Sequence, residues 1–438
     1  MQPIAIIRII NFVLAAVFAV CYSYQFFYLA VPFFKKDKPH APVRRSRFAV
    51  LICARNEEAV IGPLLESLHR QDYPAELVTV FVMADNCTDA TAQRARSGGA
   101  VVYERFNTVQ VGKGYALDEL LAAIGRDWGD VFDGYFVFDA DNLLQENYIS
   151  EMNRTFCDGY GIVTSYRNSK NYGDNWISAG YALWFLREAE FLNHARALLG
   201  TSGAVSGTGF LFSRQVLQRC GGWHFHLLTE DIEFTVASVL AGERVGYCKN
   251  AVLYDEQPVT FRQSWRQRMR WAKGYIQVFR RYGRRLLCGA AVGVPAAAPR
   301  QDVPRGPGAL CRRLACFDMA MAILPAIVLT VLGLGANLTV AVTGLLSGQN
   351  LWVAVQSVAE MLCNTYLLLL FLGTVTTLTQ WRQIHTTPLR KIWYTFTFPL
   401  FMMTYIPISF AALFQKVEWQ PIEHTVAVSL AEVRGRAS

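Results

Sequence analysis

Charge-poor apolar runs lie near both ends of the chain, at residues 9–34, 319–381 and 392–414. Glu360 is the only charged residue in the second run, and the third run contains Pro399 and Pro407. Roughly 20 consecutive apolar residues are enough to cross a bilayer as a helix. We therefore expect one membrane span within residues 1–34 and about three apolar segments within residues 317–414.

The middle of the chain alternates short apolar runs with amphipathic ones. The apolar runs predict strands at residues 48–53, 78–83, 100–103 and 135–138. The segments that follow them predict helices at residues 61–68, 90–97 and 143–152. Strand–helix alternation at this spacing indicates βαβ units and a parallel sheet. We therefore predict an α/β domain at residues 47–259.

Polar clusters recur where the predicted strands end, at Arg55–Glu58, Asp85–Asp89 and Asp139–Asn142. Open α/β sheets bind ligands at the carboxyl ends of their strands. Asp139 and Asp141 can face the same side of an extended segment, where two carboxylates repel each other. A divalent cation that also holds a diphosphate would relieve this repulsion. The alternative is a strand end with two solvated turn aspartates.

The composition indicates an integral membrane protein with a soluble catalytic domain in its middle. The chain has 438 residues, 53% of them hydrophobic, and a formal net charge of +8. Basic residues crowd the linker at residues 35–46, whereas Arg8 is the only charged residue before the first span. The positive-inside rule then places the α/β domain in the cytoplasm of a multi-pass cell-membrane protein. A cleaved signal peptide is the alternative, but the apolar run is too long for one.

A basic, aromatic segment follows the α/β domain at residues 260–288. Its Arg and Lys residues alternate with Trp, Tyr and Phe, which is typical of amphipathic helices at the headgroup level of an anionic membrane. Nucleic-acid binding uses similar residues, but the neighbouring spans argue against it. Residues 289–316 are rich in Ala, Pro and Gly and predict a linker.

The C-terminal tail, residues 415–438, begins with a segment suited to the catalytic side of the membrane. Counting three passes instead places the C-terminus outside, and the prolines of the third run permit a re-entrant path. The sequence leaves open on which side of the membrane the C-terminus lies. The ten cysteines form no CxxC pair and have no metal-ligand spacing, so neither a zinc site nor a disulfide framework is indicated.

Six motifs, taken in order, resemble those of the membrane-embedded family 2 glycosyltransferases, which include cellulose, hyaluronan, chitin and poly-N-acetylglucosamine synthases. They are Ala54-Arg55-Asn56-Glu57-Glu58, the segment from Asp85, Gly112-Lys113, Asp139-Ala140-Asp141, Thr229-Glu230-Asp231 and Gln267-Arg268-Met269-Arg270-Trp271. The resemblance implies a cytoplasmic α/β GT-A (Rossmann-like) domain with flanking transmembrane helices.

The resemblance also implies roles on the donor side. Arg55 and Glu57 would border a uridine, and Asp85 would hydrogen-bond its base, although Asp85 could instead cap the next helix. Lys113 would contact the nucleotide or diphosphate. Asp141, with Asp139, would hold Mg²⁺ or Mn²⁺, which offsets charge on the departing diphosphate.

On the acceptor side, the resemblance makes Asp231, beside Glu230, the candidate general base. The alternative is a helix start in which Thr229 is the N-cap and the acidic residues occupy the first turn. The motif at residues 267–271 would bind substrate through its polar residues and Trp271. Arg270 would meet the diphosphate and Trp271 would stack under an acceptor sugar; Gln267 and Arg268 belong to the same substrate-binding set.

Ser206-Gly207-Thr208-Gly209 matches the family's small-residue turn only loosely. A polar stripe, Gln356, Glu360 and Asn364, occupies an otherwise apolar predicted helix. It would line an exit route for a glycan, or only make interhelical hydrogen bonds.

Three functional hypotheses follow. The first is a processive, inverting β-glycosyltransferase that uses a UDP-sugar to make, and export, a polysaccharide. The second is a single transfer onto a lipid-linked acceptor. The third is a non-catalytic membrane subunit that binds a nucleotide sugar. The sequence does not identify the sugar.

Overall fold

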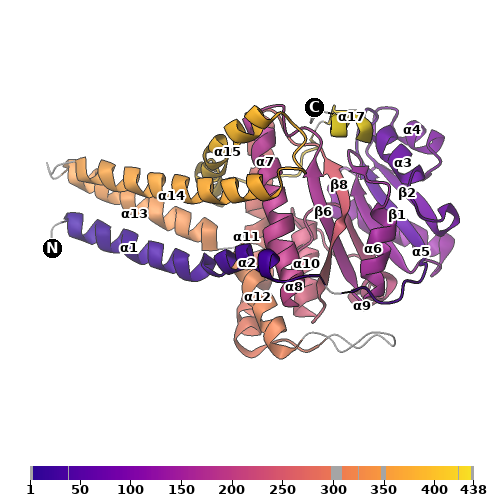
Figure 1. The fold of residues 1–438 in the computed structure, drawn as a ribbon, viewed down its shortest axis with the longest axis horizontal. Helices are drawn as coiled ribbons and strands as arrows, with labels where there is room; N and C mark the ends of the chain where they lie inside the picture. Colours follow the sequence, from indigo (N-terminus) through magenta and orange to yellow (C-terminus); the bar gives the residue numbers. More distant parts are fainter. Residues whose placement is uncertain are drawn as a thin grey trace.

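The computed structural model describes residues 3–37, 39–296, 308–323, 325–346, 352–422 and 424–435. Within these ranges, eight strands form one sheet in the order β3-β2-β1-β4-β7-β6-β8-β5 (Figure 1). The strands are β1 (Phe48–Ala54), β2 (Val78–Asp85), β3 (Val101–Arg105), β4 (Gly134–Asp139), β5 (Leu143–Leu144), β6 (Ile162–Ser169), β7 (Phe210–Ser213) and β8 (Val245–Asp255).

The predicted parallel sheet is confirmed for β3, β2, β1 and β4, which are all parallel. Ile52 of β1, for example, lies between Val82 and Phe138. The other half is mixed, because β7 runs antiparallel to β4 and β6, and β5 runs antiparallel to β8. Hydrophobic runs predict strands but contain no signal for the direction of a neighbour that is distant in sequence.

Helices cover both faces of the sheet. On one face, β1 residues such as Phe48 and Ile52 pack with α3 (Ile61–His69), α4 (Thr91–Ser97) and α6 (Tyr148–Cys157). On the other face, the alternate residue Leu51 packs with α5 (Lys113–Trp128), α9 (Arg214–Cys220) and α10 (Glu230–Leu240). A short 3₁₀ turn, η1 (Ala75–Leu77), precedes β2.

The predicted helix at residues 143–152 is wrong at its start. Leu143 and Leu144 are buried and pair with Tyr254 and Leu253 of β8, and helix begins only at Tyr148. Pairing with a strand more than a hundred residues away overrides the local helical pattern here.

The remaining helices include the apolar segments of the chain and the helices that join them to the sheet. They are α1 (Pro3–Tyr22), α2 (Tyr24–Phe34), α7 (Trp176–Arg187), η2 (a π-helix, Glu188–His194), α8 (Ala195–Leu199), α11 (Phe261–Val292), α12 (Ala309–Ile323), α13 (Pro325–Leu346), α14 (Trp352–Thr379), α15 (Pro388–Met403), α16 (Tyr405–Phe414) and α17 (Leu430–Gly435). Helix α11 extends to Val292 and α12 begins at Ala309, so both ends of the predicted linker are helical. Residues 297–307 of that linker lie outside the described ranges.

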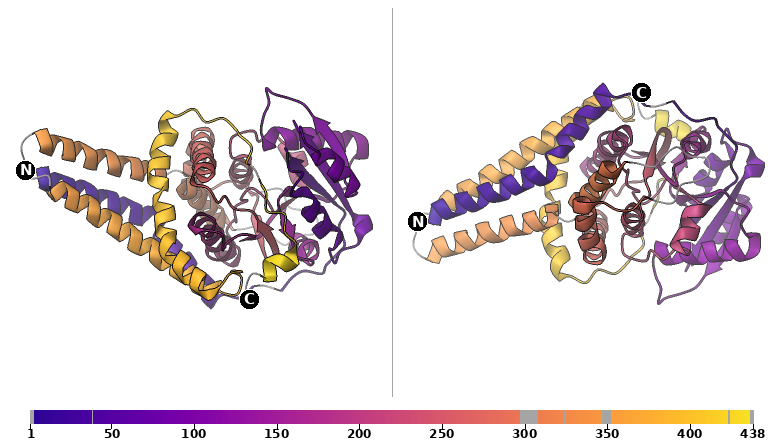
Figure 2. Two further views of the ribbon diagram at one scale, coloured as in Figure 1. Left: turned by 90° about the horizontal axis from the view of Figure 1, so that it is seen from above. Right: turned by 90° about the horizontal axis from the view of Figure 1, so that it is seen from below.

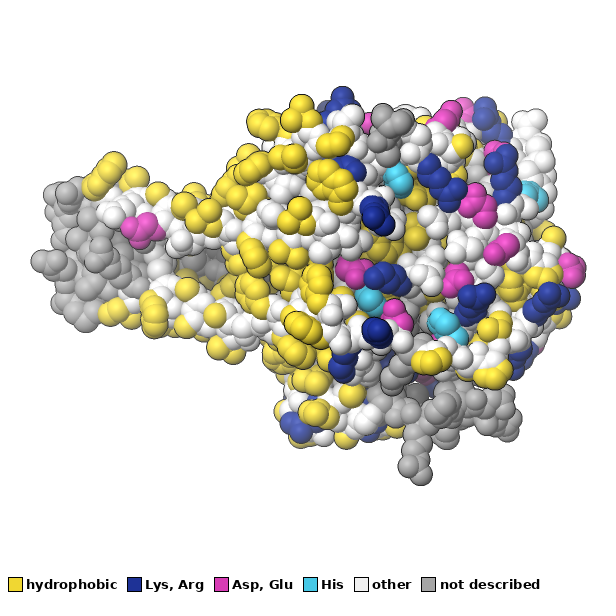
Figure 3. Space-filling view, viewed as in Figure 1, with side chains coloured by type: hydrophobic (Ala, Val, Ile, Leu, Met, Phe, Trp, Pro, Cys, Tyr) yellow, Lys and Arg dark blue, Asp and Glu magenta, His cyan; other side chains and the backbone are white. Residues whose placement is uncertain are grey.

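Four helical segments in the described part of the chain are long and apolar enough to cross a membrane: Ile9–Phe34, Ala309–Thr339, Val358–Thr379 and Pro388–Phe414. Helices α1, α13 and α14 project together from the α/β domain, in all three views (Figures 1 and 2). Charged side chains gather over the domain, whereas the projecting helices show mainly hydrophobic ones (Figure 3). The structure therefore separates a water-facing domain from an apolar region suited to a bilayer.

Candidate active site

A pocket of about 160 Å³ lies where β1, β4 and β8 end; we call it the sheet-end pocket. It brings together ten of the residues that the sequence predicted for the site. They are Arg55, Glu57, Lys113, Asp139, Asp141, Glu230, Asp231, Gln267, Arg270 and Trp271. Motifs separated by more than two hundred residues therefore converge on one cavity.

Asp139 and Asp141 are held apart by different partners. Asp139 is the last residue of β4, and its carboxylate forms an ion pair with Lys113. The Lys113 ammonium also donates to the Gly207 carbonyl oxygen at 2.8 Å. Asp141 follows in the turn and accepts a hydrogen bond from the Glu256 amide at 2.8 Å. A cation and a backbone N–H group thus relieve the predicted repulsion.

The sheet-end pocket has more acidic than basic lining residues. The acidic side chains are Glu57, Asp139, Asp141, Glu230, Asp231, Asp255 and Glu256, and the basic ones are Arg55, Lys113, Arg167, Arg270 and His424. Burial and the nearby Asp141 carboxylate raise the pKa of Asp255 to about 6. This excess of negative charge favours a bound cation.

The carboxylate oxygens of the sheet-end pocket fit Mg²⁺ or Mn²⁺ as a partial coordination site. Among the described residues, no three His, Cys, Asp or Glu side chains form a ready-made metal cage. Mg²⁺ is commonly held through one or two carboxylates together with substrate phosphates, rather than by an all-protein cage. Asp139 and Asp141 beside a cavity supply that kind of partial site.

Glu230 and Asp231 lie in the first turn of α10. The Gly207 amide donates to the Asp231 carboxylate at 2.6 Å. Burial raises the pKa of Asp231, and burial together with the Asp231 charge raises the pKa of Glu230 to about 7. Thr229 occupies the N-cap position, but its side chain makes no capping hydrogen bond. The predicted helix start is therefore present with the acidic residues in its first turn, but Thr229 does not cap it through its side chain.

The loop at residues 206–209, only a loose motif match, connects the catalytic elements. Thr208 accepts a hydrogen bond from the Asp139 amide at 2.9 Å, and Ser206 accepts one from Arg167 at 3.0 Å. Gly207 has a φ of +77°, which glycine adopts without the strain of a side chain. The loop thus fixes Asp231, Asp139 and Lys113 relative to one another.

Helix α11 presents one face of its motif to the pocket. Trp271 packs edge-to-face against Tyr181 and Phe185, with ring centroids 5.7 and 6.2 Å apart. The Gln267 side-chain oxygen is buried and has no hydrogen-bond partner among the described residues. Such an oxygen needs a donor, and a ligand hydroxyl in the cavity would provide one.

Two predicted substrate residues, Arg268 and Asp85, are not among the residues that line the sheet-end pocket. Arg268 is fully buried, donates to Thr404 and the Phe401 carbonyl, and lies 4.4 Å from the Phe401 ring. Arg268 precedes Arg270 by two residues, which corresponds to a rotation of roughly 200° around the helix, so the side chains of Arg268 and Arg270 face opposite ways. Asp85 is buried in an ion pair with Arg105 at 2.7 Å.

Several lining residues escaped the sequence analysis. Arg167 of β6 donates to Asp255 at 2.8 Å and lies 3.7 Å from the Phe185 ring. Asp255 and Glu256 follow β8 in the same strand-end arrangement that identified Asp139. That pattern could have revealed them, whereas nothing local distinguishes Arg167.

The C-terminal segment, described at residues 415–422 and 424–426, contributes residues 419–422 and 424 to the lining of the sheet-end pocket, consistent with a position on the catalytic side. Trp419 stacks 5.3 Å from the Arg55 guanidinium, and His424 hydrogen-bonds Glu57 at 2.9 Å. Burial opposes protonation of His424, but the Asp141 and Glu57 carboxylates outweigh it and raise its pKa to about 10.

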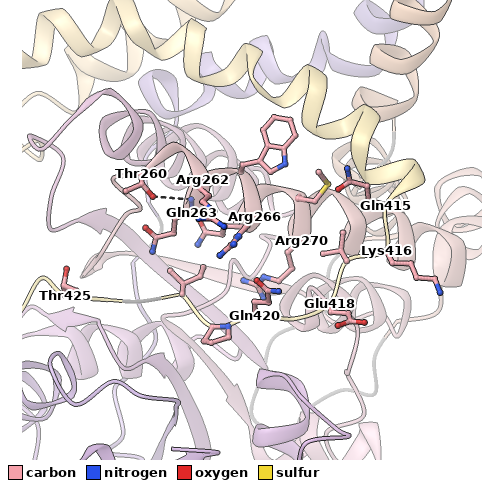
Figure 4. A pocket seen from close by; sticks show the side chains of 16 residues that line it. Thr260, Arg262, Gln263, Arg266, Arg270, Gln415, Lys416, Glu418, Gln420 and Thr425 are labelled. Carbon is pink, nitrogen blue, oxygen red and sulfur yellow. Dashed lines mark hydrogen bonds between the residues drawn. The ribbon is translucent and has the colours of Figure 1, made fainter. Parts of the chain in front are cut away.

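A larger cavity of about 570 Å³ separates this C-terminal segment from α11. Arg262, Arg266 and Arg270 extend from α11 toward the segment (Figure 4). These residues are four apart and therefore share one helix face. The predicted membrane-interface helix thus directs part of its charge toward the site.

A third cavity, of about 370 Å³, shares Asp139, Asp231, Gln267, Arg270 and Trp271 with the sheet-end pocket. It extends from there to the apolar helices, and we call it the membrane-side cavity. The candidate base therefore stands between a polar and an apolar compartment.

Comparison with known proteins identifies the family and supports the fold. Residues 45–274 match the family described as "Glycosyltransferase like family 2". The β-monoglucosyldiacylglycerol synthase of Synechocystis sp. is 30% identical over 241 residues, which are 54% of this chain and 49% of that protein. The poly-β-1,6-N-acetyl-D-glucosamine synthase of Staphylococcus epidermidis is 24% identical over 270 residues, which are 57% of this chain and 61% of that protein. The chain thus matches about half the length of the first of these relatives.

A solved structure has a similar fold along nearly the whole chain. The mannosyltransferase PcManGT of Pyrobaculum calidifontis, in complex with GDP-Man and Mn²⁺, superposes with a TM-score of 0.58. The superposition covers 92% of this chain and 98% of that one, at 18% identity. The mixed sheet and its flanking helices are therefore a GT-A-like arrangement.

Proposed function

Because the chain belongs to the glycosyltransferase family 2-like group, we propose that it is an inverting β-glycosyltransferase that uses a nucleotide sugar at a membrane surface. The observation that carries this proposal is the convergence of Asp139, Asp141, Asp231 and Trp271 on one pocket. A non-catalytic subunit would have no need of this complete set.

In the proposed reaction, an acceptor hydroxyl attacks the anomeric carbon while the bond to the diphosphate breaks. Asp231 takes the hydroxyl proton, and Gly207 holds its carboxylate in place. Lys113 and Arg270 line the pocket where they can stabilise the departing diphosphate. One displacement inverts the configuration, so an α-linked donor gives a β-linked product.

A Mg²⁺ or Mn²⁺ ion held by Asp141 and Asp139 would supply positive charge for the leaving diphosphate. The Mn²⁺ complex of the Pyrobaculum mannosyltransferase agrees with this cofactor. We propose a UDP-sugar as donor, on the motif resemblance of Arg55 and Glu57. Asp85, at the end of β2 and held in a buried ion pair with Arg105, would hydrogen-bond the uracil base of that donor.

Two products are compatible with this chemistry. A polysaccharide follows from the motif at residues 267–271 and from relatives named as poly-N-acetylglucosamine synthases. A glycolipid follows from the Synechocystis relative, whose name specifies a diacylglycerol product. We propose that membrane lipids surround the apolar helices and that the α/β domain lies in the cytoplasm, without a nucleic-acid partner.

Turnover of a panel of UDP- and GDP-sugars by the purified full chain tests the proposal. The assay would follow nucleoside diphosphate release with Mg²⁺, with Mn²⁺ and with a chelator. We expect release from one donor, only with metal, and loss of release in Asp231→Asn. Equal release by the variant would contradict the assigned base.

A further inference from the structure

The membrane-side cavity has a polar end beside the catalytic residues. Asp139, Glu188 and Asp231 contribute carboxylates there, and Arg167 and Arg270 contribute guanidinium groups. Arg167 is already paired with Asp255 and Asp139 with Lys113, which leaves Glu188 and Asp231 against Arg270. The polar end therefore carries a slight excess of negative charge, which disfavours an anionic headgroup and suits an uncharged one that offers hydroxyls.

The other end of this cavity is built from three of the four candidate membrane spans. Its apolar lining consists of Ala322, Ile323, Ile327, Leu369, Met402, Met403 and Ile406. From these spans, only Thr365, Tyr405 and Ser409 add polar groups among the described lining residues. The lining thus changes from charged to hydrocarbon within one cavity.

Such a lining does not suit a polysaccharide chain. Sugar hydroxyls buried against Ile, Leu and Met side chains lose hydrogen bonds to water without replacement. The predicted alternative path is not supported either, because Gln356, Glu360 and Asn364 are exposed on α14 and do not line the cavity. The Gln356 side-chain amide donates a hydrogen bond to the Glu360 carboxylate in the same helix at 2.9 Å. The polar stripe therefore satisfies part of its own hydrogen-bonding capacity.

We propose that the acceptor is a single membrane lipid with an uncharged, hydroxyl-bearing headgroup. Its headgroup occupies the polar end near Asp231, Glu188 and Gln267, and its hydrocarbon lies between α12–α13, α14, α15 and α16. This inference rests on the proposed glycosyltransferase function and selects the single-transfer product.

The chemistry balances without a further reactant. The lipid hydroxyl oxygen forms a bond to the anomeric carbon, and the bond from that carbon to the diphosphate oxygen breaks. The leaving diphosphate takes the bonding electrons, and the hydroxyl proton passes to Asp231. Burial raises the pKa of Glu188, consistent with a carboxyl group held in the same desolvated end of the cavity.

The experiment uses the full chain reconstituted in phosphatidylcholine vesicles with a radiolabelled form of the donor that the panel identifies. Three arms contain diacylglycerol, a polyprenyl phosphate or a soluble oligosaccharide. We expect label in the organic phase of the diacylglycerol arm, as a lipid carrying one sugar. Label found only in the polyprenyl phosphate arm, or only in a water-soluble polymer, would overturn the proposal of an uncharged lipid acceptor. Either result would leave the proposed glycosyltransferase function in place. Absence of donor turnover in every arm would overturn both.

Filling the apolar end provides a second test. Met402→Trp and, separately, Ile406→Phe should reduce lipid glycosylation about tenfold or more, because they occupy the space for hydrocarbon. The thermal shift caused by nucleoside diphosphate should remain, since the sheet-end pocket is unchanged. Leu400→Trp is the matched control, because Leu400 lies on α15 but is half exposed and outside the cavity. Unchanged lipid transfer by a folded filling variant would contradict the proposal.

Discussion

The sheet-end pocket and the membrane-side cavity share candidate catalytic residues but differ in the polarity of their linings and in the elements that form them. The first is lined by charged side chains from strand ends and by residues 419–422 and 424 of the C-terminal segment. The second is lined mainly by aliphatic side chains from candidate membrane spans. Asp231 and Trp271 belong to both.

This difference suggests how one site can join two substrates of opposite polarity. A nucleoside diphosphate needs cations and hydrogen bonds, whereas hydrocarbon needs only the absence of unsatisfied polar groups. Placing the general base at the boundary lets each substrate remain in a compatible environment until bond formation. Substitutions on either side should therefore have separable effects.

The largest effect on activity is expected for Asp231, which lines both cavities. Asp231→Asn removes the proton acceptor and should lower kcat by about 10²–10⁴-fold, with donor binding retained. Steady-state kinetics and nucleotide-induced thermal shifts measure the two quantities. Asp118→Asn is the control, because Asp118 is a partly exposed residue of α5 that pairs with His226 outside both cavities. Equal loss of donor binding would mean that Asp231 acts in folding or donor binding instead.

On the donor side, Asp141→Asn should weaken metal binding. Removing one of two candidate carboxylate ligands should lower kcat/KM about 10–100-fold at limiting Mn²⁺. Excess Mn²⁺ should restore part of the activity, and the thermal shift that Mn²⁺ produces should shrink. A variant with wild-type Mn²⁺ dependence would show that Asp141 is not a ligand.

Glu230→Gln should move the pH dependence rather than abolish activity. Burial, and after it the Asp231 charge, raises the pKa of Glu230 to about 7, so Glu230 gains its proton as pH falls through about 7. Glu230→Gln removes this ionisation beside the candidate base, so the kcat/KM profile should lose the change that occurs near pH 7 while activity remains. An unchanged pH profile would contradict a role for the Glu230 proton.

Stability gives an independent measurement of the same group. The native state keeps a Glu230 proton that the unfolded chain releases near its ordinary pKa of 4.5. The free energy of unfolding should therefore fall as pH rises from about 4.5 to about 7, then level off. In Glu230→Gln this decline should be smaller, as followed by thermal unfolding in detergent.

The smallest effect on catalysis is expected at Arg268, whose side chain is buried outside both cavities. Arg268→Ala removes the buried hydrogen bonds that Arg268 donates to Thr404 and to the Phe401 carbonyl and should cost about 1–3 kcal/mol of stability. The KM of the donor should stay unchanged for the fraction that remains folded. A raised donor KM at wild-type stability would restore the original substrate-binding prediction for Arg268.

Most of the site could be predicted from the sequence because its residues follow strand ends. Apolar runs identify β1, β2 and β4, and parallel strands place their carboxyl ends on one edge of the sheet. The sequence therefore predicts that Arg55, Asp139 and Asp141 lie close together in space. Arg167 could not be found this way, because its role depends on β8, whose Asp255 is 88 residues away.

Local pattern alone determined that the chain has apolar spans, an α/β domain and strand-end carboxylates, since hydrophobic periodicity and strand ends are local properties. Tertiary structure decided which side of α11 faces the site, so Arg270 lines the pocket and Arg268 packs against α15. It also decided that three spans meet beside Asp231 to form an apolar cavity. The physical reason is that a cavity is enclosed by residues distant in sequence, and its polarity depends on which helix faces meet.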